Sequence, residues 1–141
     1  MTRPIRVLLV EDNPGDADLT RDTLEASARA YEIAVAVDGE EAIDYVLRRG
    51  RHAGAERPDQ ILLDLNLPRL HGAEVLAEIK RHDALRAIPI VVFTSSDAET
   101  DIVQSYQRGA NGYVTKVGDL AGFVAKIHAI EQWWFTIVTL P

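Results

Sequence analysis

The chain of 141 residues has no cysteine, which excludes disulfide bonds and thiolate metal sites. No apolar run approaches the roughly 18 residues of a membrane span, and residues 1–4 lead straight into an apolar run, leaving no room for a signal peptide. The formal net charge is −7, whereas direct nucleic-acid binding usually rests on a basic face. We therefore expect a cytoplasmic protein with no direct nucleic-acid contact and no membrane contact.

Short apolar runs rich in β-branched residues alternate with segments of helical periodicity along the whole chain. Five such repeats predict an α/β fold, a doubly wound five-stranded parallel sheet with helices on both faces. We expect residues 1–132 to form one domain and residues 133–141 an aromatic C-terminal tail. The expected strands are 5–10, 31–37, 61–63, 88–93 and 113–114, and the expected helices are 14–29, 38–49, 72–82, 97–107 and one from about 119, with a loop over 50–59.

Polar residues follow four of the predicted strands. Glu11 and Asp12 follow the first, Asp64 the third, Thr94 the fourth and Lys116 the fifth. Ligands of open parallel sheets bind outside the carboxyl ends of the strands, so these side chains can converge. Adjacent carboxylates repel one another unless a cation lies near them, and hard oxygen ligands favour Mg²⁺. The pattern predicts a magnesium site with a carboxylate, a hydroxyl and an ammonium beside it.

Each of these residues also has an ordinary structural explanation. Asp12 can cap the following helix, and Asp64 can bond its own turn. Thr94 can cap a helix instead of donating to a phosphoryl oxygen, and Lys116 can be a surface lysine. Asp64 is the candidate nucleophile toward a phosphoryl group, because carboxylates form acyl phosphates when cations neutralise the developing charge.

Four segments of the chain stand out: VLLVEDN (7–13), LLDLNLP (62–68), VVFTS (91–95) and GANGYVTK (109–116). They strongly resemble the receiver domain of two-component response regulators, and the resemblance spans essentially the whole chain. It implies the flavodoxin-like (CheY-like) fold with sheet order 2-1-3-4-5, and a receiver domain over residues 1–132.

The resemblance implies a role for each matched residue. Asp64 would accept a phosphoryl group from the phosphohistidine of a sensor histidine kinase. Thr94 and Lys116 would contact the phosphoryl oxygens. The protein would not be an enzyme, because it would promote only its own phosphorylation and dephosphorylation. The implied Mg²⁺ ligands are Glu11, Asp12, Asp64 and the backbone carbonyl of Asn66.

The resemblance also implies a conformational switch. Thr94 would move toward the phosphoryl group while Tyr113 rotates inward, and Asn66 and Ser96 would tune the rate of dephosphorylation. One position departs from the family, which usually has proline after the lysine, whereas Val117 follows Lys116 here. A cis bond before a non-proline residue costs about 2.5–4 kcal/mol, so we expect the bond between them to be trans.

The C-terminal residues Trp133, Trp134 and Phe135 cannot all face one core from consecutive helical positions. Exposed aromatic clusters often mark partner surfaces, and we expect this tail to support a homodimer. The tail and the loop over 50–59 are similar to the small stand-alone regulators paired with bacterial phytochromes. That similarity implies a light-sensing phytochrome kinase as the partner and a homodimer that also uses the fourth helix, fifth strand and fifth helix.

Other interpretations stay open at this point. The chain can serve a non-phytochrome kinase or act as a phosphorelay intermediate. A phosphatase of the haloacid dehalogenase type would also use an aspartate after a strand, but it needs a second aspartate where this chain has Asn66. A flavin carrier would need a serine-, threonine- and glycine-rich loop after the first strand, and a P-loop nucleotidase a glycine-rich lysine loop.

Overall fold

The computed structural model describes residues 3–116 and 118–141. Its five strands pair in parallel in the order β2-β1-β3-β4-β5, which confirms the predicted doubly wound sheet. The elements in chain order are β1 (Ile5–Val10), α1 (Pro14–Glu25), β2 (Tyr31–Ala36), α2 (Gly39–Val46), the 3₁₀ turn η1 (Gly50–His52), β3 (Gln60–Leu63), α3 (Gly72–Arg81), β4 (Ile90–Thr94), α4 (Glu99–Gln107), β5 (Gly112–Thr115), α5 (Leu120–Gln132) and the π-helical turn η2 (Trp133–Ile137).

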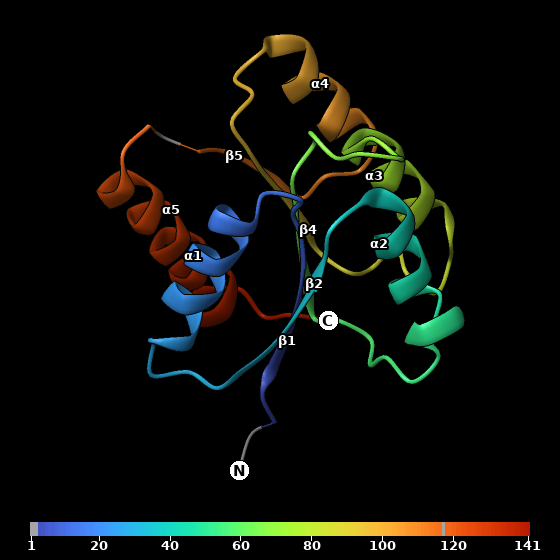
Figure 1. The fold of residues 1–141 in the computed structure, drawn as a ribbon, viewed down its shortest axis with the longest axis horizontal. Coiled ribbons are helices and arrows are strands. Elements are labelled where there is room, and N and C mark those ends of the chain that lie inside the picture. The colour runs from blue at the N-terminus through green and yellow to red at the C-terminus, as the bar shows by residue number, and fades with distance from the viewer. Residues whose placement is uncertain (1–2, 117) are drawn as a thin grey trace.

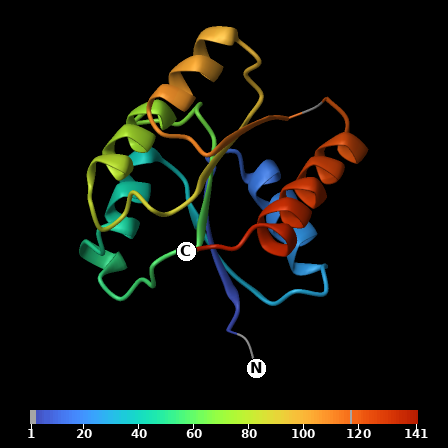
Figure 2. The same ribbon diagram turned by 180° about the vertical axis from the view of Figure 1, so that it is seen from behind.

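The sheet separates two cores. Helices α1 and α5 cover one face, and α2, α3 and α4 cover the other (Figures 1 and 2). Side chains of a strand alternate between faces, so Leu8 of β1 packs with α2 and α3 while Leu9 packs with α1 and α5. Because both faces of the central strands are buried, their sequences are continuously apolar rather than alternating.

Several elements end earlier or start later than the sequence predicts, each for a local reason. Helix α1 stops at Glu25 instead of near residue 29. Ser27 Oγ accepts the Arg29 N–H, and this bond competes with helical hydrogen bonding. Helix α2 stops at Val46 because Arg48 adopts the left-handed region with φ 57°. Strand β4 begins at Ile90 rather than residue 88, since Pro89 has no N–H for the ladder.

The strand register brings the polar residues to one edge of the sheet. Val10 pairs with Leu63, so the residues that follow β1 and β3 emerge side by side. The Asp64 amide donates to the Val10 carbonyl at 3.0 Å, and the Lys116 amide donates to the Thr94 carbonyl at 2.7 Å. These backbone bonds, together with the pairing of β3 with β4, place all four strand ends in one region.

Gly72 lets α3 approach this edge closely. A Cβ at Gly72 would lie 2.3 Å from the Asp64 carbonyl oxygen, too close for any side chain. Helix α3 therefore packs directly on the backbone that carries Asp64.

The C-terminal segment divides its aromatic residues between the core and the surface. Trp134 and Phe135 pack against the core on the α1 and α5 side, and the Phe135 ring lies edge-on to Tyr31 at 5.6 Å. Trp133 is 54% exposed. At least one exposed ring was expected, and this part of the expectation is confirmed. The expected trans bond after Lys116 involves Val117 and lies outside the described residues.

Among the residues that the structure describes, no helix has the length and apolar character needed to cross a membrane.

Candidate functional site

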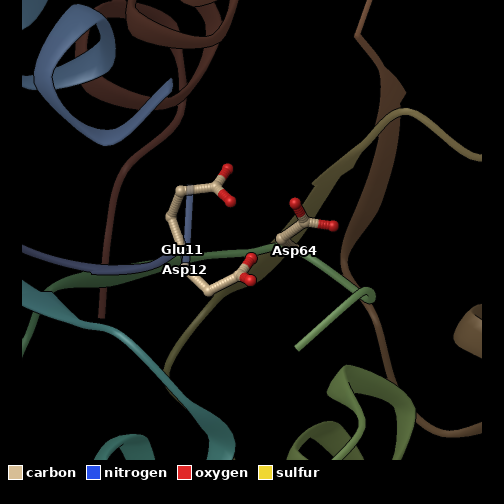
Figure 3. A group of neighbouring side chains, drawn as sticks. All are labelled: Glu11, Asp12 and Asp64. Atoms are coloured by element: carbon tan, nitrogen blue, oxygen red, sulfur yellow. The ribbon is translucent and has the colours of Figure 1, made fainter. Parts of the chain in front are cut away.

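Three carboxylates meet at the carboxyl end of the sheet. Glu11 and Asp12 follow β1 and Asp64 follows the neighbouring β3, and one oxygen of each lies within 4.8 Å of the others (Figure 3). Glu11 and Asp64 are buried, whereas Asp12 is exposed. The sequence predicts this convergence from strand ends alone, and the register of β1 and β3 produces it.

Asp64 has both of its oxygens engaged by neighbours. Oδ1 accepts the Thr94 hydroxyl at 2.8 Å and the Asn66 amide at 3.1 Å, and Oδ2 lies 3.0 Å from Lys116 Nζ. Burial alone would raise the pKa of Asp64, but the Asn66 amide, Lys116 and Thr94 together hold it below its ordinary value. Asp64 is therefore ionised at neutral pH and has the charge that a nucleophilic carboxylate needs.

Lys116 is nearly buried and contacts three carboxylates. Its Nζ atom pairs with Glu11 Oε1, with Asp16 Oδ2 at 2.9 Å and with Asp64 Oδ2 at 3.0 Å. Burial alone would lower the pKa of Lys116, but the hydrogen bonds to Glu11 and Asp16 outweigh it and raise the pKa. The ring of Phe93 lies 5.7 Å from the ammonium.

The site holds more negative than positive charge. Among the residues that the structure describes, Lys116 is the one cation paired with Glu11, Asp16 and Asp64, and Asp12 lies beside them. Burial raises the pKa of Glu11 to about 7, even though Lys116 lowers it, and the like charge of Asp64 adds to the rise. Hard carboxylate oxygens with an excess of negative charge fit Mg²⁺ or a similar divalent cation.

Thr94 is completely buried and lies with Asp64 and Lys116, as the sequence predicts. Tyr113 of β5 is half-buried, and its hydroxyl donates to the Ser96 carbonyl at 2.8 Å rather than to water. Ser96 Oγ in turn donates to Asp101 Oδ2 at 2.6 Å in the first turn of α4. A chain of hydrogen bonds thus connects β5 to α4 through the residues that follow Thr94.

The predicted dimer residues lie elsewhere. Trp133, Trp134 and Phe135 follow the C-terminal end of α5, and Phe135 touches Tyr31 at the amino end of β2, opposite the carboxylates. The structure does not bring them to the acidic site. The histidines do not form a metal group with the acidic residues within the described part of the chain, and His71 caps α3 by accepting the Ala73 amide.

The sequence reasoning missed Asp16. It lies in the first turn of α1, and nothing in its position marks it as more than a favourable charge near a helix N-terminus. An open groove of about 350 Å³ beside it is lined by Asp16, Ser95, Lys116 and Phe123 among others. Asp16 and Lys116 therefore border a groove between α1 and the start of α5.

Known proteins resemble this chain in sequence and in fold. Residues 7–128 match the response regulator receiver domain. The response regulator Rcp1 of Synechocystis sp. is 41% identical over 98% of this chain and 94% of its own length. A crystal structure of the Mn²⁺-bound form of response regulator Rcp1 has a TM-score of 0.94 and 40% identity over 98% of this chain and 99% of that one. A crystal structure of the phosphorylated cyanobacterial phytochrome response regulator RcpA has a TM-score of 0.96 and 42% identity over 99% of both chains.

Proposed function

Because the chain belongs to the response regulator receiver domain family, we propose that Asp64 accepts a phosphoryl group from the phosphohistidine of a sensor histidine kinase. The observation that carries the proposal is the position of the Asp64 carboxylate between the Thr94 hydroxyl and the Lys116 ammonium. A phosphorylated structure exists for the similar protein RcpA.

In the proposed reaction an oxygen of Asp64 attacks phosphorus while the bond from phosphorus to the histidine nitrogen breaks. The products are an acyl phosphate on Asp64 and a free histidine side chain. Negative charge on the phosphoryl oxygens has to be balanced throughout the transfer. Lys116 supplies positive charge, and Thr94 supplies a hydroxyl donor next to the reacting oxygen.

We propose that Glu11, Asp12, Asp64 and the Asn66 carbonyl hold Mg²⁺ in this site. The excess of carboxylates over cations supports this assignment, and the similar protein Rcp1 has a structure with Mn²⁺ bound. When bound, the ion would supply positive charge next to the transferred group.

The proposed output is a conformational switch through Thr94 and Tyr113. The Thr94 hydroxyl bonds Asp64 Oδ1 in this structure, and an added phosphoryl group offers it stronger acceptors. A shift of Thr94 would move the residues after it, whose Ser96 carbonyl holds the Tyr113 hydroxyl. Asn66 and Ser96 lie two residues past Asp64 and Thr94, and we propose that they set the lifetime of the phosphorylated state.

A phytochrome kinase is the proposed partner, because RcpA is a phytochrome response regulator and resembles this chain over nearly its whole length. The cytoplasm is the proposed location of this chain. A non-phytochrome kinase or a role as phosphorelay intermediate would use the same site. A phosphatase of the haloacid dehalogenase type would need a carboxylate where exposed Asn66 stands. As a receiver domain, the chain would act on no substrate other than its own aspartyl phosphate.

The phosphoacceptor is tested by labelling with acetyl phosphate and Mg²⁺. The wild type should gain one phosphoryl group, measured by intact-protein mass spectrometry, because Asp64 is ionised and lies at the carboxyl end of the sheet beside Lys116. Asp64→Asn should gain none, since an amide is not nucleophilic. Asp59→Asn, an equally buried aspartate at the other end of β3, is the matched control and should label like the wild type. Equal labelling of Asp64→Asn and wild type contradicts the proposal.

We also propose a homodimer that uses α4, β5, α5 and the tail of residues 133–141. The exposed apolar side chains on these elements support it: Val103, Tyr106, Leu120, Trp133 and Ile137. Because Trp134 and Phe135 are partly buried, the proposed contact rests mainly on Trp133, with the other two rings securing the tail to its own domain.

Truncation before Trp133 and the substitution Trp133→Ala should both weaken the dimer. Trp133→Ala should raise the dimer Kd by about tenfold or more, as expected for an interface tryptophan. Sedimentation velocity across a concentration series measures this. Val37→Ala removes a similarly exposed apolar side chain after β2 and should leave the dimer unchanged. Identical sedimentation of all four proteins counts against the proposed interface.

A further inference from the structure

Among the described residues, three carboxylates contact Lys116, and Asp16 is the one that lies outside the metal-ligand group. Its Oδ2 atom is 2.9 Å from Lys116 Nζ. Glu11 and Asp64 also contact the ammonium, but both belong to the cluster whose oxygens converge for a cation. Asp16 alone is free to keep its contact when the site fills.

We propose that Asp16 is a positioning residue that holds the Lys116 ammonium beside Asp64 during phosphoryl transfer. This inference rests on the proposed function of Asp64. Asp16 does not touch the reacting atoms in this arrangement, and it acts through the lysine. It has no place in the set of residues that the sequence pattern predicts.

The donors of the ammonium explain why such an anchor is needed. Lysine has three N–H donors, and in this structure Glu11, Asp16 and Asp64 take one each. Transfer converts Asp64 to an acyl phosphate, and a cation competes for Glu11. Lys116 would then lose two partners, and a bond to Asp16 would leave two donors directed at phosphoryl oxygens.

The backbone of Lys116 is held by its N–H bond to the Thr94 carbonyl, but this bond does not fix the position of the ammonium. The side chain is a flexible four-carbon stem. The Phe93 ring bounds the space beside the ammonium but accepts no strong hydrogen bond. A charged acceptor on a neighbouring helix is therefore the restraint with the right chemistry.

Asp16 is itself held firmly. Its backbone N–H donates to Asn13 Oδ1 at 3.0 Å, and Pro14 occupies the first turn of the helix. The adjacent Ala17 is buried in the core. The Asp16 side chain is 34% exposed, so its carboxylate reaches the groove and stays partly hydrated.

Three variants separate positioning from charge. Asp16→Ala removes the acceptor, Asp16→Asn keeps an oxygen acceptor but removes the charge, and Asp18→Ala removes the same charge from an exposed position of α1. The rate of labelling by acetyl phosphate at saturating Mg²⁺ should fall about tenfold for Asp16→Ala, the size expected for one hydrogen bond between charged groups. The labelling rate of Asp16→Asn should stay within about threefold of the wild-type rate. The rate of Asp18→Ala should equal that of the wild type.

Two readouts independent of turnover complete the test. Lys80, Lys116 and Lys126 are the lysines of the chain, so the Nζ signal of Lys116 can be assigned by ¹⁵N NMR with Lys116→Met. With Mg²⁺ and beryllofluoride, a stable phosphoryl mimic, the Lys116 ammonium should exchange its protons faster in Asp16→Ala than in wild type. The Mg²⁺ concentration for half-saturation should not change, because Asp16 is not a predicted ligand.

Wild-type rates and exchange in Asp16→Ala overturn the inference. Faster labelling of Asp16→Ala also overturns it, because Asp16 would then compete with the phosphoryl group for the lysine. If Asp64→Asn labels as the wild type does, the proposed function fails as well, so the two failures are distinguishable.

Discussion

Strand β3 has an aspartate at each end, and the two are alike in burial but not in partners. Asp59 precedes the strand and Asp64 follows it, and each is 7% exposed. Asp59 accepts two hydrogen bonds from the Arg3 guanidinium, at 2.6 and 2.8 Å, and one from the Arg6 amide at 2.8 Å. Asp64 instead shares a single ammonium with Glu11 and Asp16.

The comparison separates a structural carboxylate from a reactive one. At Asp59 one carboxylate pairs with one guanidinium in a bidentate contact. Such a pair leaves no excess negative charge for a bound cation to balance. At Asp64 the negative charge exceeds the positive charge, so a divalent cation gains favourable interactions by binding. Burial alone therefore does not identify the functional aspartate, whereas the local charge balance does.

The largest expected effect concerns the metal. At a Mg²⁺ concentration 100 times its Kd, the free energy of unfolding should rise by about 2.7 kcal/mol, because the ion binds only the folded site. Asp12→Asn removes one carboxylate of the cluster without disturbing Lys116. If it raises Kd tenfold, the gain at the same Mg²⁺ concentration should fall to about 1.4 kcal/mol. Urea unfolding with and without Mg²⁺ measures both values.

Asp59→Asn is the matched control for this experiment. Its baseline stability should be lower than that of the wild type, but the increment that Mg²⁺ adds should be the same, because Asp59 lies at the far end of the strand. An equal Mg²⁺ increment in the wild type and in Asp12→Asn would show that Asp12 is not a ligand of the ion.

The sequence predicts the fold and most of the acidic site for a simple physical reason. Strand ends of a parallel sheet lie along one edge, so Asp12, Asp64, Thr94 and Lys116 can be brought together by counting strands. Glu11 follows from its adjacency to Asp12. What is needed is only the order of the elements, and hydrophobic periodicity supplies it.

Contacts that depend on side-chain conformation could not be predicted in the same way. Asp16 meets Lys116 across 100 positions of sequence, and only the packing of α1 against α5 and the reach of the lysine side chain bring them together. The ion pair of Arg3 with Asp59 could not be predicted either, because both residues lie just outside the strands that they connect. The π-helical turn at Trp133–Ile137 also has no local signal, because it forms where aromatic rings fold back on the core.

The smallest expected effect tests the other member of the comparison. Asp59→Ala should lower the free energy of unfolding by about 1–2 kcal/mol, because the Arg6 amide loses its acceptor, while the Arg3 pair, half exposed, adds little. Burial raises the pKa of Asp59, but the bonds from Arg3 and the Arg6 amide outweigh it and hold the pKa below 3.8. The wild-type advantage over Asp59→Ala should therefore persist from pH 7 to about pH 4 and shrink below that, as protonation of the folded state removes it. Urea midpoints of both proteins from pH 7 to pH 3 give this difference, and an advantage that grows on acidification would show that Asp59 is not held as an ionised pair.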